Sequence, residues 1–265
     1  MTLIQSIFLG ALQGIAEFLP VSSSGHLVVF RNFMHLGEIS PLFDILLHVA
    51  TLMVVLIVFR RIIVDLIKSL FRFITRKADE SDSVNLRLIL IILLASAITA
   101  VLGLFIQSFD VSHKPKLVSV LFLVTAAVLL LTRFINTEGA GYEKAGVKTA
   151  VITGIAQGLA VFPGISRSGM TIASSLWVGI DKEKAGEYSF LLSIPAIAGA
   201  LLLELRDLEQ LSGTVDPLVI SAGMLTAFIV GLASVLFLLR LIKRNKLHYF
   251  SIYLIPFGII SFFLL

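Results

Sequence analysis

The chain has 265 residues, of which 57% are hydrophobic and 14% are charged, and its mean hydropathy is +1.01. These values exclude an ordinary soluble globular domain and favour a polytopic helical membrane protein, because the apolar runs reach about twenty residues, the length that crosses a bilayer. The net charge of +4 does not indicate nucleic acid as a partner, and the lack of cysteine excludes disulfides, thiolate metal sites and thiol nucleophiles.

The first apolar segment, residues 2–26, contains several polar and turn-forming residues. Glycines, Pro20 and three consecutive serines interrupt it, so we expect two short helices around a Ser/Gly turn instead of a straight span. Such a re-entrant hairpin is tolerated only where protein or a watery cavity covers its backbone. Met1–Gly10 has no Lys or Arg, and Gln13 and Glu17 interrupt the apolar part, so we expect this segment to be retained and not cleaved as a signal peptide.

The rest of the first half predicts three spans and one surface helix. The spans are residues 42–59, 88–106 and 117–134. Between the first two spans, the basic loop 60–87 contains a stretch, Ile62–Ile74, with helical apolar spacing and basic residues between. We expect this stretch to lie in the membrane interface.

The second half begins, after a glycine-rich connector, with another broken apolar hairpin. This hairpin covers Val147–Gly164 and Ser168–Ile180, and the three spans that follow are residues 188–203, 217–239 and 249–265. The chain therefore predicts six spans in addition to the two hairpins.

The charge of the connecting loops predicts the orientation of the chain. Loops 60–87, 133–148 and 240–248 are basic and are expected in the cytoplasm, whereas loop 204–216 is acidic and is expected outside. Both chain ends are then extracytoplasmic. The first hairpin enters the membrane from outside and the second from the cytoplasm.

An internal repeat connects the two hairpins. Gln13–His26 aligns without a gap with Gln157–Met170, and seven of the fourteen positions are identical. Each copy precedes three spans, and an odd number of spans reverses the orientation of the second copy. Inverted repeats bring broken helices together near the midplane, so we expect the tips Ser22–His26 and Ser166–Gly169 to face each other across one cavity.

The predicted fold is therefore an all-α polytopic membrane protein with six transmembrane helices and two re-entrant helical hairpins, arranged as an inverted-topology repeat. It forms a single membrane domain over residues 1–265. Repeat one covers about 1–135, a connector about 136–146, and repeat two about 147–265.

The charged residues at the two tips suggest a phosphate site. Arg167 offers a planar fork that matches phosphate geometry, and its Ser and Gly neighbours let the backbone approach an anion closely. A snorkelling arginine is the alternative. Glu17 could be a metal ligand, a general base or the partner of Arg167, because a buried charge needs compensation.

The remaining candidates form a set around these two charges. Ser23 is the expected nucleophile or phosphate ligand, and His26 is either a proton carrier or a hydrogen-bonded core residue. Asp44 and His48 lie one helical turn apart and could support the site from behind or form a structural hydrogen bond. Gln13 and Gln157 either bond to backbone or reach the site. The expected phosphate-binding residues are Ser22, Ser24, Gly25, Ser166, Arg167, Ser168 and Gly169.

At these residues the chain resembles a known family. The stretches QGIAEFLPVSSSGH (13–26) and PGISRSGMT (163–171) are similar to those of the bacitracin-resistance type of undecaprenyl-diphosphate phosphatase, and the resemblance covers nearly the whole chain. It implies a multi-pass enzyme of the bacterial plasma membrane that hydrolyses undecaprenyl diphosphate to undecaprenyl phosphate and inorganic phosphate. This reaction recycles the lipid carrier of peptidoglycan synthesis and confers bacitracin resistance on overexpression. The resemblance also implies a divalent cation, Mg²⁺ or Ca²⁺.

The resemblance assigns roles to individual positions. Ser23 and His26 fall on the proposed nucleophile and proton-transfer positions, and Ser166 with Arg167 on the phosphate-binding pair. Glu17 falls on the second acidic position of a Glu/Gln-x-x-x-Glu motif and would hold the metal. The first position is Gln13 here, which leaves one carboxylate fewer for a metal, and Asp44 is a candidate to compensate.

Two other functions remain as alternatives. A transporter or flippase for phosphorylated isoprenoid lipid would use the same inverted repeat and anion site without hydrolysis, and a membrane scaffold would leave the buried charges unexplained. The first hairpin opens outward in the predicted topology, which favours an extracytoplasmic active site. The oligomeric state is left open, with a homodimer among the options.

Overall fold

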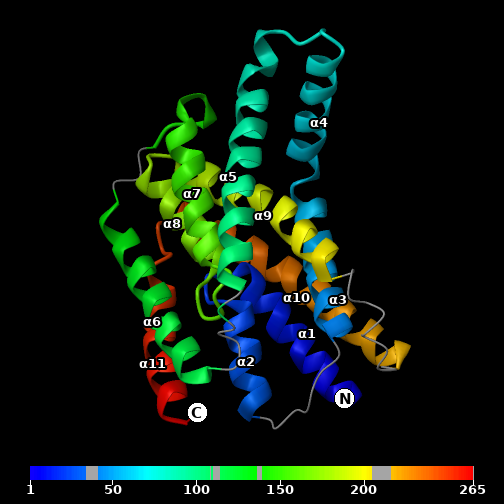
Figure 1. Ribbon diagram of the computed structural model, residues 1–265, viewed down its shortest axis with the longest axis vertical. Helices are drawn as coiled ribbons and strands as arrows, with labels where there is room; N and C mark the ends of the chain where they lie inside the picture. Colours follow the sequence, from blue (N-terminus) through cyan, green and yellow to red (C-terminus); the bar gives the residue numbers. More distant parts are fainter. Residues whose placement is uncertain (34–40, 108, 110–113, 136–138, 205–215, 265) are drawn as a thin grey trace.

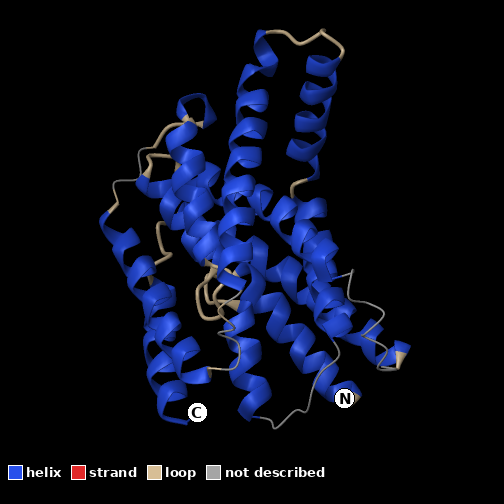
Figure 2. Cartoon of the chain, viewed as in Figure 1, coloured by secondary structure: helices blue, strands red, loops and turns tan. Residues whose placement is uncertain are grey.

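The computed structural model describes residues 1–33, 41–107, 109, 114–135, 139–204 and 216–264. Within these ranges the regular elements are helices, joined by short loops (Figure 2), apart from one isolated bridge between Ala140 and Ile180. The predicted all-α class is confirmed for this part of the chain. Most of the predicted acidic loop, residues 205–215, lies outside the described residues.

The helices follow the segments that the hydropathy pattern predicts. In chain order they are α1 Leu3–Phe18, α2 Ser23–Phe33, α3 Pro41–Val58, α4 Arg60–Ile74, α5 Ser83–Gln107, α6 Pro115–Leu131, α7 Val147–Leu159, α8 Arg167–Trp177, α9 Lys182–Glu204, α10 Pro217–Lys243 and α11 Tyr249–Leu264. Three short 3₁₀ turns, η1 Glu80–Asp82, η2 Thr132–Phe134 and η3 Tyr142–Lys144, lie between them.

Four of these helices, α5, α6, α9 and α10, are long and apolar enough to cross a membrane. Helices α3 and α4 together pass the same test but are bent by 77° at their junction, so they count as a fifth span at most. The last predicted span, α11, is apolar but has 16 residues. By length and composition, the described residues therefore contain four to five candidate spans.

Each predicted hairpin break is present and has a local cause. Helix α1 ends at Phe18, shortly before Pro20, and α2 begins at Ser23 after Ser22, whose φ of 70° lies in the left-handed region. Between α7 and α8, Gly164 has a φ of 98°, a conformation that glycine adopts without steric cost. The chain thus reverses at both tips.

Each hairpin packs on a long helix from the other half of the chain. Helix α1 lies along α10, and α7 lies along α5 (Figure 1). Close backbone contact allows this, since a Cβ on Gly10 would lie 2.3 Å from the carbonyl oxygen of Gly223, and one on Gly154 would lie 2.8 Å from that of Ala95. Gly10 and Gly154 precede Gln13 and Gln157 by the same three positions.

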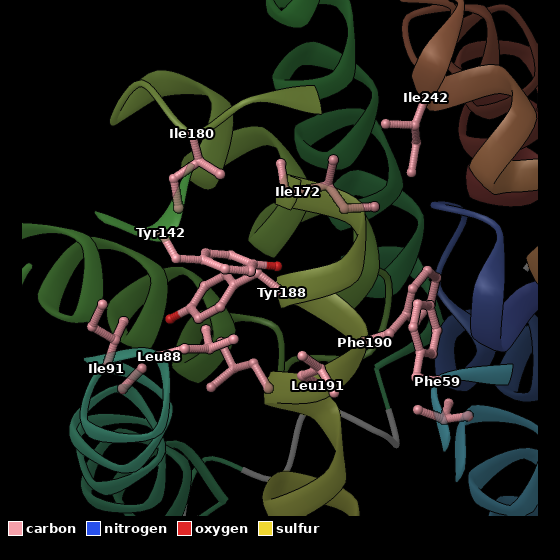
Figure 3. Close-up of a cluster of buried hydrophobic side chains, with 14 of the residues drawn as sticks. Phe59, Leu88, Ile91, Tyr142, Ile172, Ile180, Tyr188, Phe190, Leu191 and Ile242 are labelled. Atoms are coloured by element: carbon pink, nitrogen blue, oxygen red, sulfur yellow. The ribbon is translucent and has the colours of Figure 1, made fainter. Parts of the chain in front are cut away.

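A large apolar cluster lies between the second hairpin and its neighbours (Figure 3). Tyr188 and Phe190 of α9 are fully buried in it, and the Tyr188 hydroxyl lies 2.8 Å from the Thr153 hydroxyl on α7. Tyr142 of η3 lies beside Tyr188 (Figure 3) and donates a hydrogen bond to Glu187 at 2.9 Å. Because the hydroxyls of both tyrosines have hydrogen-bond partners, their rings can be buried, and they hold α9 against the second hairpin.

The two chain ends lie at the same end of the molecule, and α4 with its turn into α5 lies at the opposite end (Figure 1). This arrangement agrees with an even number of crossings between the two termini.

Candidate functional site

The two hairpin tips contact each other directly. The Ser22 hydroxyl of the first tip accepts a hydrogen bond from the Gly164 amide of the second at 3.0 Å, and from the Gly25 amide at 3.3 Å. A Cβ on Gly25 would lie 2.7 Å from the Gly164 nitrogen, so this glycine is required for the approach. The expected meeting of the tips is present in the structure.

Glu17, near the end of α1, is the centre of the polar contacts between the tips. Its Oε1 pairs with Arg167 at the start of α8, and its Oε2 accepts hydrogen bonds from the Ser23 hydroxyl at 2.8 Å and from Gln13 Nε2 at 3.2 Å. The Glu17 side chain is 6% exposed. Of the roles expected for Glu17, the structure contains the partnership with Arg167.

Arg167 has a donor left over after this pairing. Its Nη2 binds Glu17, whereas its Nη1 is buried without a hydrogen-bond partner in the described part of the chain. Leaving a buried charged donor unpaired costs more than a hydrogen bond returns, so a ligand that accepts from Nη1 is favoured. Ser166 caps α8 by accepting from the Gly169 amide at 3.1 Å, which fixes the start of that helix.

These groups border a cavity of about 870 Å³. Its polar wall contains Glu17, Ser22, Ser23, Ser24, His48, Gln157, Ser166 and Arg167. Its apolar wall is made mainly of small and aliphatic side chains from α5 and α9, among them Ala100, Gly103, Ala196 and Gly199. Ser23 and Arg167 are the first residues of α2 and α8, so the partial positive charge of two helix N-termini would favour an anion in this cavity.

His48 of α3 faces this cavity beside the charged pair. Its Nδ1 lies 3.0 Å from Gln13 Nε2 and 3.6 Å from Glu17 Oε2, and its side chain is 36% exposed. Gln13 itself is fully buried behind Glu17 and His48. The structure thus brings two of the residues expected to support the site into contact with Glu17.

His26 lies elsewhere, in an aromatic pocket between α2, α6 and α11. Its Nδ1 donates to the Ser22 carbonyl oxygen at 2.8 Å, and its Nε2 lies 2.8 Å from the Tyr253 hydroxyl. Its ring stacks on Phe257 with 4.4 Å between centroids, and the residue is 2% exposed. His26 does not border the cavity.

The other predicted residues are distributed around the tips. Asp44 pairs with Arg31 of α2, away from Glu17. Gln157 borders the cavity from α7 and donates to the Thr99 hydroxyl at 3.2 Å. Ser168 is buried, with its hydroxyl 3.3 Å from that of Ser166, and Gly25, Ser168 and Gly169 do not border the cavity.

Three contributors were missed by the sequence reasoning. Thr125 of α6 accepts from the Ser166 amide at 3.1 Å and donates to the Gly164 carbonyl at 2.8 Å, which holds the second tip in place. Tyr253 contacts His26 through a hydrogen bond, and Arg31 forms an ion pair with Asp44. A hydroxyl within the apolar run of α6 was the available signal for Thr125. Nothing in sequence pairs Tyr253 with His26, 227 positions away.

The described residues do not form a metal site by themselves. No group of three or more His, Asp or Glu side chains is placed to hold an ion among the described residues. Glu17, the one carboxylate among the described residues that line the cavity, already uses both oxygens in protein contacts. A cation held by protein ligands alone therefore does not fit this arrangement.

Comparison with known proteins gives one consistent family. The family model described as bacitracin resistance protein BacA matches residues 6–260. A protein of Treponema denticola named undecaprenyl-diphosphatase is 47% identical over 98% of this chain and 96% of its own length. Proteins with the same name from Borrelia recurrentis and Borrelia hermsii are 41% and 39% identical, and each match covers at least 97% of both chains.

Proposed function

The chain belongs to the bacitracin resistance protein BacA family, and on this basis we propose that it is a membrane-bound undecaprenyl-diphosphatase. It hydrolyses undecaprenyl diphosphate to undecaprenyl phosphate and inorganic phosphate, and so recycles the lipid carrier of the cell wall. The observation that carries the proposal is the Glu17–Arg167 pair, which joins the two hairpins at the polar wall of the cavity.

In this proposal Arg167 binds the terminal phosphate through its unpaired Nη1, while its Nη2 stays on Glu17. The hydroxyl of Ser166 and the N-termini of α2 and α8 add favourable polar groups at the same wall. Charge stabilisation and positioning of this kind account for most of the catalysis in phosphoryl transfer.

Ser23 is the proposed nucleophile. Its hydroxyl donates to Glu17 at 2.8 Å, so Glu17 can take the proton as the Ser23 oxygen forms a bond to the terminal phosphorus. The bond from that phosphorus to the bridging oxygen breaks, and undecaprenyl phosphate leaves. Water then hydrolyses the phosphoserine. In the second version, Ser23 and Glu17 hold the attacking water and no covalent intermediate forms.

The proton-transfer role of His26 stays a prediction, since its ring nitrogens are engaged by Ser22 and Tyr253. The divalent cation expected from the resemblance also stays a proposal. Because the protein ligands do not fit an ion alone, diphosphate oxygens would supply most of its coordination, and we assign it no step.

The inverted repeat, the six spans and an active site that opens to the outside are part of the proposal. Three observations support this part of the proposal. Gly10 of α1 and Gly154 of α7 make equivalent close contacts, each hairpin packs on a long helix from the other half of the chain, and the two termini lie at the same end of the molecule (Figure 1). We place the protein in the bacterial plasma membrane, with the isoprenoid tail along the apolar wall of the cavity or in lipid. All the named site residues come from one chain, and the homodimer stays a prediction.

Phosphate release from undecaprenyl diphosphate by the purified protein in detergent tests the proposal. We expect hydrolysis by the wild type and its loss in Arg167→Ala. A transporter or flippase, the alternative function, needs a sealed compartment and releases no phosphate in detergent. A folded wild type that releases none would refute the hydrolase.

A further inference from the structure

The two imidazoles near the tips differ in what their ring nitrogens can still bind. Both nitrogens of His26 have partners within the protein, and its ring is enclosed by aromatic side chains. His48 borders the cavity, and only its Nδ1 has a hydrogen-bond partner among the described residues. His48 is therefore the imidazole whose second nitrogen is available to a bound substrate.

The neighbours of Gln13 decide which way its amide points. Its Nε2 lies 3.2 Å from Glu17 Oε2, an oxygen of the carboxylate that pairs with Arg167. The opposite amide orientation would place an oxygen against this anion and remove a hydrogen bond, so the NH₂ group must face Glu17. The same NH₂ lies 3.0 Å from His48 Nδ1.

This geometry fixes the tautomer of His48. An amide NH₂ has two hydrogens and accepts nothing, so one hydrogen goes to Glu17 and the other to His48 Nδ1. His48 Nδ1 must accept, and in the neutral ring the hydrogen is then on Nε2. Gln13 thereby turns the opposite edge of His48 into a hydrogen-bond donor.

We propose that His48 is a substrate-contacting residue that donates its Nε2 hydrogen to a diphosphate oxygen, and that Gln13 is the positioning residue that sets this tautomer. The inference rests on the proposed function, because it uses the same cavity and the same anion as Arg167. It gives the cavity a donor from α3, in addition to those of the two hairpins. It also gives the amide of Gln13 a role that a glutamate at the same position would not have.

Glutamate at position 13 would remove this effect. In the Gln13→Glu variant two buried carboxyl groups would lie within hydrogen-bond distance and share one proton, so the side chain at position 13 would present an acceptor to His48 Nδ1. The imidazole would then turn its hydrogen toward position 13 and present an acceptor to the substrate. The identity of residue 13 and the contribution of His48 are therefore coupled.

The main test is steady-state hydrolysis of undecaprenyl diphosphate by the full chain in detergent, with inorganic pyrophosphate as a competing anion. His48→Ala should raise KM and the pyrophosphate inhibition constant about tenfold, the loss expected for a hydrogen bond to a charged group. His48→Gln should stay within about threefold of wild type, because its side chain has both an acceptor and a donor. His248→Ala, an imidazole on the loop after α10, is the matched control and should not change either constant.

A double-mutant cycle tests the role of Gln13. Gln13→Glu should cost more in the wild-type background than in His48→Ala, because part of its effect acts through the imidazole. Equal costs in the two backgrounds would remove Gln13 from the proposal.

Nitrogen-15 NMR of histidine-labelled wild type observes the tautomer directly and does not depend on any variant folding. The signal that is lost in His48→Gln should belong to an Nε2–H ring and should shift when pyrophosphate is added. An Nδ1–H ring, or wild-type constants in a folded His48→Ala, would overturn the proposal. A wild type without phosphate release would instead refute the hydrolase itself.

Discussion

Among the described residues, two buried carboxylates, Asp82 and Glu17, each pair with an arginine. Asp82 of η1 is bound by Arg72 of α4, only ten positions away, through Nε at 2.8 and 3.1 Å and through Nη2. Glu17 is bound by Arg167, 150 positions away, through one nitrogen. The first pair closes a turn near the protein surface, and the second joins two hairpins.

The difference lies in what each pair leaves unsatisfied. Asp82 also accepts from the Asp79 amide at 3.3 Å, and the Arg72 side chain is 44% exposed, so water can reach its free hydrogens. Arg167 keeps a buried nitrogen without a partner, next to a cavity. The Arg72–Asp82 pair stabilises a turn, whereas the unpaired Arg167 nitrogen is the donor that we propose binds phosphate.

The largest expected effect distinguishes the two arginines by activity. Arg167→Ala should lower phosphate release about a thousandfold, because it removes the charge that stabilises the transferred phosphoryl group. Arg72→Ala should leave kcat and KM unchanged, since Arg72 lies outside the cavity. A phosphate-release assay on equal amounts of folded protein measures both variants. A similar loss of activity in the two would contradict the distinction between the two pairs.

The next effect concerns the hydroxyl that Glu17 holds. Ser23→Ala should reduce kcat by about a hundredfold or more. The variant lacks the hydroxyl that either attacks the phosphorus or holds the attacking water beside Glu17. Ser221→Ala, an exposed serine on α10, is the control. If Ser23 is the nucleophile, acid-quenched reaction mixtures should contain protein with phosphate bound to Ser23. Protein without bound phosphate would favour direct attack by water.

A smaller effect tests the contact that brings the second pair together. Gly25→Ala should destabilise the protein by about 1–3 kcal/mol, since its new Cβ overlaps the Gly164 backbone. Activity should fall with it because Arg167 and Glu17 move apart. Gly146→Ala, where a Cβ meets nothing within 4 Å, should show no comparable change in a thermal melt.

The smallest effect is on acid stability and belongs to the first pair. The hydrogen bond from Arg72 lowers the pKa of Asp82 to about 2, below its usual value near 3.8. A lowered carboxyl pKa adds stability that is present above the usual value and is lost as pH falls toward 2. Arg72→Gln should therefore lower Tm slightly at pH 7, and the difference from wild type should shrink below pH 4. A constant difference down to pH 2 would contradict this origin.

The sequence predicted what depends on local pattern. Helix positions and both hairpin breaks followed from hydropathy and turn residues, and the repeat of Gln13–His26 indicated that the two tips meet. The pairing of Glu17 with Arg167 was one of three roles considered for Glu17. The repeat was informative because two similar breaks must meet if their halves are inverted. These predictions agree with the structure where it describes the chain.

Contacts between distant helices could not be predicted from one sequence. Asp44 and His48 lie one helical turn apart on α3, yet Asp44 pairs with Arg31 of α2 and His48 contacts Gln13 of α1. His26 follows three serines like a reactive residue, but Phe122, Tyr253 and Phe257 close around it. Such selection depends on packing between helices, which hydropathy does not encode.

The packing of α1 on α10 has a consequence for how the protein is made. Helix α1 ends at Phe18 and α10 begins at Pro217, so the first hairpin leaves the ribosome about 200 residues before its partner. At typical rates of synthesis this interval lasts roughly ten to forty seconds. Glu17 lacks Arg167 for about the first 150 residues of this interval and lacks the α10 surface for all of it, and an unpaired carboxylate is costly in hydrocarbon. The hairpin must therefore wait at the membrane surface or beside an insertion factor, and its final entry is a late step of assembly.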